Sequence, residues 1–120
     1  MSGKMSKNKG KRGERELANK LSKLWSIPFS RGQQYKGSPD SPDVTTSDFE
    51  LSRAIHIECK RVEQLSLYKA LEQASKDAGD RVPIVMHRRN GKDWVAVVEL
   101  DRLLDLVVAL KDIAEDQVPW

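Results

Sequence analysis

The stretch AIHIECKRV, residues 54–62, constrains the fold of this 120-residue chain more than any other segment. Side chains of a β-strand alternate between two faces, so one face of this stretch is aliphatic and the other carries His56, Glu58 and Lys60. An ordinary half-buried strand has interchangeable polar residues on its second face. Here an acid and a base lie two residues apart on a strand whose other face is aliphatic. This arrangement indicates a central strand that also contributes side chains to a functional site.

Helical and strand patterns on both sides of this strand predict a layered α/β domain. Apolar residues recur at helical spacing from Glu14 until Pro28, and again over residues 67–78. The remaining expected elements are a loop at 30–42, strands at 43–46 and 49–51, a hairpin of strands 82–88 and 94–98 that turns at Asn90-Gly91, and a last helix capped by Asp101. We therefore expect a mixed β-sheet with a covering helix on each side.

Length and charge suggest one small domain with a basic arm. Residues 1–36 carry ten Lys or Arg and two acids, for a net charge of +8, whereas residues 37–120 carry a net charge of −5. We expect residues 1–9 to form a flexible arm and residues 10–120 to form a single domain. A basic arm ahead of an acidic body suggests a polyanionic partner, since Lys and Arg displace counterions from phosphates.

Several classes of protein are disfavoured by the composition. The longest apolar run, residues 106–110, is far shorter than the roughly 20 residues that a membrane span needs. The single cysteine excludes an internal disulfide, which fits a reducing cytoplasm. One cysteine and two separated histidines do not form a structural zinc site of the usual spacing.

The first predicted helix carries two acids that point in different directions. At about 100° per residue, Glu14 falls in the middle of the apolar face, while Glu16 falls on the solvent side. A carboxylate that points inward is costly unless something binds it. A helix start that frays is the alternative explanation, because acids in a first turn favour the helix dipole.

A metal site is the simplest explanation for the remaining acids. Asp43 lies where a loop enters a strand, and its carboxylate meets that of Glu58 if the two strands pair, since paired strands lie roughly 5 Å apart. Two carboxylates that close repel unless a cation lies between them, and Mg²⁺ is a hard ion held by one or two carboxylates. The backbone carbonyl of Cys59 and the Glu14 carboxylate, directly or through water, are further candidate ligands. Lys60 would orient a water or stabilise phosphate charge.

The order of these motifs resembles a known group of nucleases. The chain shows G-x-x-x-E-R at residues 10–15, S-R-G at 30–32, P-D-V at 42–44, I-E-C-K at 57–60 and E-Q-A at 72–74. This order resembles the PD-(D/E)xK nuclease superfamily, and within it the archaeal-type Holliday junction resolvases. The resemblance implies a restriction-endonuclease-like fold, Mg²⁺ (with Mn²⁺ as a substitute), a functional Ser30 and a homodimer that cuts the two symmetric strands of a four-way DNA junction.

Basic residues outside the metal site are candidates for contact with the DNA backbone. These candidates are Lys9, Lys11, Arg12, Arg15, Arg31, Lys36, Lys69 and Gln73. Two other functions stay open at this point. One is a restriction-like or repair nuclease that cuts duplex, flap or end substrates. The other is a DNA-binding module without activity, in which the acids only pair with Lys60 and Arg61. The resemblance implies no small-molecule cofactor and no membrane, and it places the protein in a prokaryotic or phage-infected cytoplasm.

Overall fold

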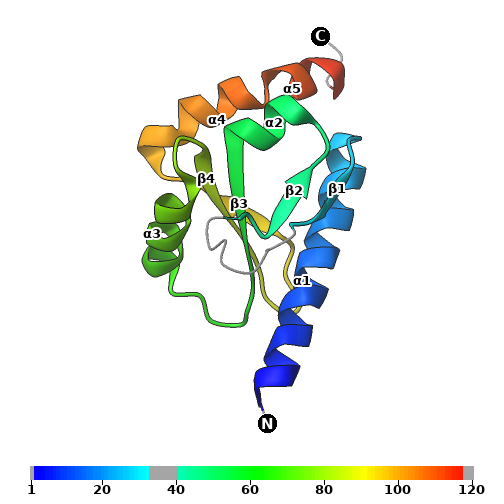
Figure 1. Cartoon of the computed structure of the whole chain (residues 1–120), viewed down its shortest axis with the longest axis vertical. Coiled ribbons are helices and arrows are strands. Elements are labelled where there is room, and N and C mark those ends of the chain that lie inside the picture. The colour runs from blue at the N-terminus through cyan, green and yellow to red at the C-terminus, as the bar shows by residue number, and fades with distance from the viewer. Residues whose placement is uncertain (1, 33–40, 118–120) are drawn as a thin grey trace.

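The computed structural model describes residues 2–32 and 41–117, with side chains from residue 10 onward (Figure 1). The elements are α1 (Ser2–Trp25), β1 (Phe29–Arg31), β2 (Val44–Thr46), α2 (Phe49–Ala54), β3 (Ile55–Arg61), α3 (Leu67–Ala78), β4 (Val82–Arg88), β5 (Val95–Val97), η1 (Leu100–Arg102), α4 (Leu103–Ala109) and α5 (Lys111–Gln117). The five strands form one mixed sheet in the order β1-β2-β3-β4-β5. The prediction of an α/β fold with a mixed sheet flanked by helices is confirmed.

β3 lies in the middle of the sheet and sets the register of its neighbours. It runs parallel to β4 and antiparallel to β2, and Val44 of β2 lies opposite Ile57 of β3. Because partners in an antiparallel pair move in opposite directions along the chain, Asp43 lies opposite Glu58. The two strands therefore pair in the way that brings Asp43 and Glu58 together.

Helices cover both faces of the sheet, as the sequence predicted. On one face Leu17 and Leu21 of α1 are buried in one core with Ile57 of β3. On the other face Leu71 and Ala74 of α3 pack in a second, smaller core with Val85 of β4. Figure 1 shows α1 and α3 on opposite sides of the central strands. The polar side of β3 therefore faces α3, and its aliphatic side faces α1.

The first helix begins at Ser2, which is earlier than the apolar pattern indicates, because that pattern becomes visible only from Glu14. Residues 2–9, predicted as a flexible arm, have helical backbone here. The helix ends with Ser26 at a positive φ of 54°, and Pro28 follows. Gly13 is required for the close packing of α1 on β3, because a Cβ at this position would lie 2.6 Å from the Cβ of Arg61.

Polar contacts between α1 and the hairpin of β4 and β5 correct the expected direction of Glu16. Glu16 was expected to face solvent, but it forms an ion pair with Arg88 and accepts a hydrogen bond of 3.0 Å from Nε1 of Trp94. Both partners come from the hairpin of β4 and β5, more than seventy residues later in the chain. The helical pattern alone therefore does not predict them. Trp94 also packs against the core.

Three local predictions are wrong. The expected loop at 30–42 begins with strand β1, which is too short to show an alternating pattern. The expected strand at 49–51 is the start of helix α2, because the Asp48 side chain caps it by accepting a hydrogen bond from the backbone N–H of Leu51. The last helix is divided into η1, α4 and α5, and Asp101 lies inside η1 instead of capping the helix.

No helix among the described residues is long and apolar enough to cross a membrane.

Candidate metal and DNA site

Asp43 and Glu58 meet at the point where the loop before β2 enters the sheet. The backbone N–H of Asp43 donates to the carbonyl of Ile57 at 2.9 Å, which continues the pairing of β2 and β3. Asp43 Oδ2 accepts a hydrogen bond of 2.8 Å from the backbone N–H of Cys59. The Glu58 carboxyl is a close neighbour of Asp43, and it contributes to the raised pKa of the Asp43 side chain. Two acid side chains, one of them 7% exposed, are thus held in contact by the backbone.

Burial and the neighbouring acids raise the pKa of Asp43 from 3.8 to about 7. Desolvation is the largest cause, followed by the negative charges of Glu58 and Glu14, and the Cys59 N–H opposes them. Two carboxylates this close repel each other unless a proton or a cation lies between them. Two carboxylates, together with the backbone carbonyl of Cys59 next to Glu58 in the chain, would be a suitable donor set for a hard divalent ion.

The raised pKa of Asp43 predicts how metal-free stability changes with pH. The folded state holds this proton more tightly than the unfolded chain, so the resulting stabilisation is full below about pH 4 and is lost as the pH rises to about 7. Asp43→Asn carries no such proton, and we expect its melting temperature to exceed that of wild type by about 4 °C or more at pH 8. Thermal unfolding in EDTA at pH 5 and pH 8 measures this difference. An equal difference in melting temperature at the two pH values would contradict the prediction.

Cys59 contributes its backbone and not its thiol. Its side chain packs against the α1 face of the sheet. Burial, followed by the charges of Asp43, Glu14 and Glu16, raises the pKa of the Cys59 thiol to about 12. The thiol therefore stays protonated at neutral pH and is a poor nucleophile.

Glu14 lies on the inner side of α1, as the helical spacing predicted, and it has a partner. Nε of Arg31, on β1, donates to Oε1 of Glu14 at 2.9 Å, with both side chains partly buried. Glu14 also contributes to the raised pKa of Asp43, so it belongs to the same group of acids. Arg31, which was predicted to contact DNA, forms this ion pair with Glu14 and stays partly exposed.

Lys60 follows Glu58 on β3 and lies between two hollows in the surface. One hollow, of about 410 Å³, lies between α1 and the end of β3 and includes Glu14 in its lining. The other, of about 400 Å³, lies against α3 and includes Lys69 and Gln73. Lys60 lines both hollows. Its positive charge partly offsets the rise in the pKa of the neighbouring Cys59 thiol. Its ammonium can therefore be approached from solvent while it stays next to the acids.

Gly32 keeps Asp43 in place through a close backbone contact. Its N–H donates to the Asp43 carbonyl at 2.8 Å, and a Cβ at residue 32 would lie 2.0 Å from the carbonyl oxygen of Pro42. We expect Gly32→Ala to displace Asp43 and to lower the divalent-metal affinity of the protein by about 10–100-fold, the size of effect seen when the support of a metal ligand is lost. Calorimetric titration with Mn²⁺ measures it. Gly91→Ala, in the turn between β4 and β5 where a Cβ would meet nothing within 4 Å, is the matched control, and equal affinity in the two variants would contradict the prediction.

His56 and Asp77 also belong to this region, although neither was predicted as a site residue. His56 shares a face of β3 with Glu58 and is completely buried, and its Nε2 lies 2.8 Å from Oε1 of Glu58. Asp77 of α3 places a carboxylate oxygen within 4.8 Å of ligand atoms of both residues. Asp77 lies four residues after Gln73 on the flank of α3, and only the packing of α3 on β3 brings it to this site.

The remaining predicted site residues that the structure describes lie on α1, α3 and β1. Lys11, Arg12 and Arg15 are exposed on α1, and Lys69 is exposed on α3. Gln73 donates to Asp77 at 2.8 Å, so its amide is held by α3 itself. Ser30 is exposed on β1, opposite Thr45. Lys36 and the side chain of Lys9 lie outside the described residues.

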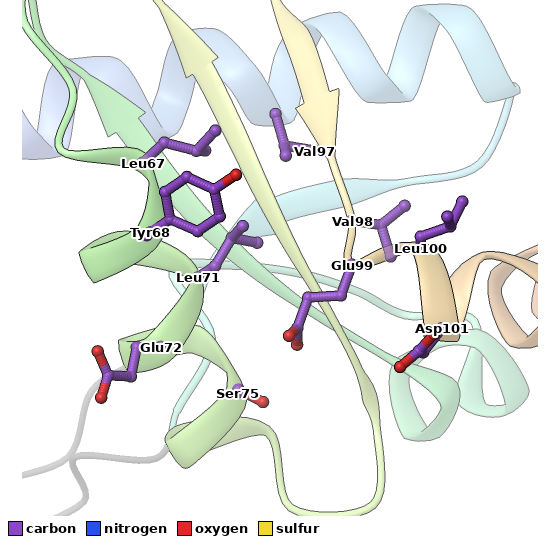
Figure 2. Close-up of a pocket in the computed structure, with 10 residues that line it drawn as sticks. All are labelled: Leu67, Tyr68, Leu71, Glu72, Ser75, Val97, Val98, Glu99, Leu100 and Asp101. Atoms are coloured by element: carbon purple, nitrogen blue, oxygen red, sulfur yellow. The ribbon is translucent and has the colours of Figure 1, made fainter.

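A larger apolar groove lies elsewhere and does not fit a phosphodiester. Figure 2 shows that it lies between α3 and the segment that follows β5, with Leu71, Val97 and Val98 among its lining residues. Its polar lining includes the carboxylates of Glu72, Glu99 and Asp101, which would repel a phosphate. The acids around Asp43 are therefore the better candidate for DNA chemistry.

Comparison with known proteins places the chain in a family of nucleases. A family model described as "Phage putative PDDEXK endonuclease" matches residues 5–118. The search of curated proteins and the search of solved structures each gave no match. The matched span includes all five strands and the acids and lysine described above.

Proposed function

The chain belongs to this family of phage PD-(D/E)xK endonucleases, and we propose that it is a Mg²⁺-dependent endonuclease that resolves four-way DNA junctions. Family membership supports nuclease activity in general. The observation that carries the proposal is the contact between Asp43 and Glu58 on paired strands, with Lys60 two residues further on. The order of the E-R, P-D-V, E-C-K and E-Q-A motifs supports a junction as the substrate.

The acids would hold the metal. Asp43, Glu58 and the backbone carbonyl of Cys59 are the proposed ligands, and Glu14 reaches the ion directly or through water. Mg²⁺ bound there would supply Lewis acidity and positive charge at the scissile phosphate, and Mn²⁺ would substitute for it. The ion pair with Arg31 holds the Glu14 side chain at the edge of this group.

Lys60 would act on the reacting groups themselves. Its ammonium, next to the acids and open to solvent, would orient the attacking water and stabilise the charge that develops on the phosphate. Ser30 on β1 would contact the DNA strand beside the cleaved bond. These roles require only the side chains that this face of the sheet presents.

Basic side chains around the site would hold the DNA backbone. Lys11, Arg12 and Arg15 on α1, together with Lys69 on α3, are the exposed candidates, and Lys9, Lys36 and Gln73 complete the proposed set. Such contacts bind without reading sequence, so selectivity would come from the shape of the junction. A homodimer would place two sites on the two symmetric strands, in the cytoplasm of a prokaryotic or phage-infected cell.

A substrate panel distinguishes this function from its alternatives. Cleavage rates are compared on an immobile four-way junction, a flap and a linear duplex with the same arm sequences, in Mg²⁺. We expect paired symmetric cuts in the junction at a rate well above that for the other two. Equal cutting of the linear duplex would support the restriction-like alternative, with which the family match is equally compatible. Binding without cutting would support a module without activity, although Arg61 pairs with Glu16 and Glu63 here.

A further inference from the structure

His56 is the most deeply buried polar side chain beside the proposed metal ligands. Its exposed fraction is 0%, that of Glu58 is 7%, and their side chains are joined by a hydrogen bond of 2.8 Å. Both project from the α3 side of β3, two residues apart. A polar ring placed there at the cost of its hydration needs a function, since an aliphatic residue would fill the same space more cheaply.

The environment of the ring determines which of its nitrogens carries the proton. Nδ1 is buried and, among the described residues, has no hydrogen-bond partner. A proton on Nδ1 would be a buried donor without an acceptor, which is more costly than a buried lone pair. The proton therefore lies on Nε2, and the neutral ring donates to Oε1 of Glu58. A ring in this tautomer cannot offer Nε2 to a metal ion.

We propose that His56 is a positioning residue that orients the Glu58 carboxylate for metal binding. This inference rests on the proposed function, since the orientation of Glu58 matters only if Glu58 is a ligand. The Glu58 carboxylate is hydrogen-bonded to His56, and Asp43 lies opposite it on the neighbouring strand. Without the His56 donor, the flexible Glu58 side chain can turn toward Lys60, which projects from the same face of β3.

Three variants test this role by metal binding, which is read separately from cleavage. His56→Leu keeps the volume and removes the donor, His56→Asn keeps an amide that is too short to reach Glu58, and His56→Gln restores an amide donor of suitable length. Calorimetric titration with Mn²⁺ gives the dissociation constant, and thermal unfolding identifies any variant that does not fold. We expect His56→Leu and His56→Asn to bind Mn²⁺ about 10–100-fold more weakly, with His56→Gln recovering most of the loss.

Two results would overturn the proposal. One is wild-type affinity in folded His56→Leu or His56→Asn. The other is a loss in folded His56→Gln as large as in His56→Asn. If His56→Leu does not fold, the comparison of the two amides still decides the question. Asp77→Asn tests the competing idea that His56, Glu58 and Asp77 ligate an ion together; a loss in Asp77→Asn that matches the His56→Asn loss would refute a purely orienting role. Failure of the proposed function is distinguishable, because wild type would then neither bind Mn²⁺ nor cut any DNA substrate.

Discussion

Asp43→Asn is expected to reduce DNA cleavage by at least about 100-fold while junction binding stays at the wild-type level. The amide keeps the acceptor for the Cys59 N–H and the shape of the side chain, so the strand pairing survives. It removes the charge that would bind a divalent ion. Loss of an outer partner of a metal ligand alone costs roughly 10–100-fold, and loss of a ligand should cost more. Single-turnover cleavage and a gel-shift titration in Ca²⁺ measure the two quantities.

The matched control for this variant is Asp48→Asn. Asp48 caps α2, and asparagine caps a helix about as well, so this change of an acid to an amide should leave both cleavage and folding intact. Wild-type cleavage by Asp43→Asn would refute the location of the site. Equal loss of cleavage and of binding would instead mean that Asp43 supports the DNA-binding surface, which contradicts its proposed role as a ligand.

Lys60→Gln is expected to lower the single-turnover cleavage rate by about 10²–10³-fold with little change in metal affinity. Removing one group that stabilises charge in a transition state typically costs this much. Glutamine keeps most of the side-chain length, and the ammonium of Lys60 is proposed to act on water and phosphate and not to bind the ion. The rate is measured at saturating Mg²⁺ on DNA that is already bound, and Mn²⁺ affinity is measured by calorimetry.

Lys92→Gln serves as the control for this change, because Lys92 is exposed in the hairpin turn between β4 and β5. It should cleave at the wild-type rate. If Lys60→Gln cuts as fast as Lys92→Gln, Lys60 has no part in the chemistry. If Lys60→Gln loses metal affinity as strongly as Asp43→Asn does, its role is to organise the acids, and the assignment to the transition state is wrong.

The sequence predicted the centre of the fold because its signals there are local. The alternation in β3 and the position of Asp43 at a strand entrance led to the inference that Asp43 and Glu58 meet if their strands pair, and the register of β2 and β3 places them opposite each other. The inward direction of Glu14 also followed from helical spacing alone. These inferences need only the period of a helix or strand and the spacing of neighbouring strands.

Features that depend on distant segments were missed. Arg31 became the partner of Glu14 only because β1 pairs with β2 and brings residue 31 beside α1. Glu16 gained Arg88 and Trp94 from a hairpin more than seventy residues away. The complete burial of His56 depends on α3 packing over β3. One local signal was available but not used, namely the cap at Asp48 that turns residues 49–54 into a helix.

The most direct test of the central claim is one cleavage time course on an immobile four-way junction, with wild type and Glu58→Gln, each in Mg²⁺ and in EDTA. Glu58→Gln keeps the size of a buried side chain that contacts both Asp43 and His56. We predict that only wild type in Mg²⁺ cuts the junction, while both proteins still bind it. Cleavage by folded Glu58→Gln, or by wild type in EDTA, would show that the acids of β2 and β3 are not a metal-dependent nuclease site.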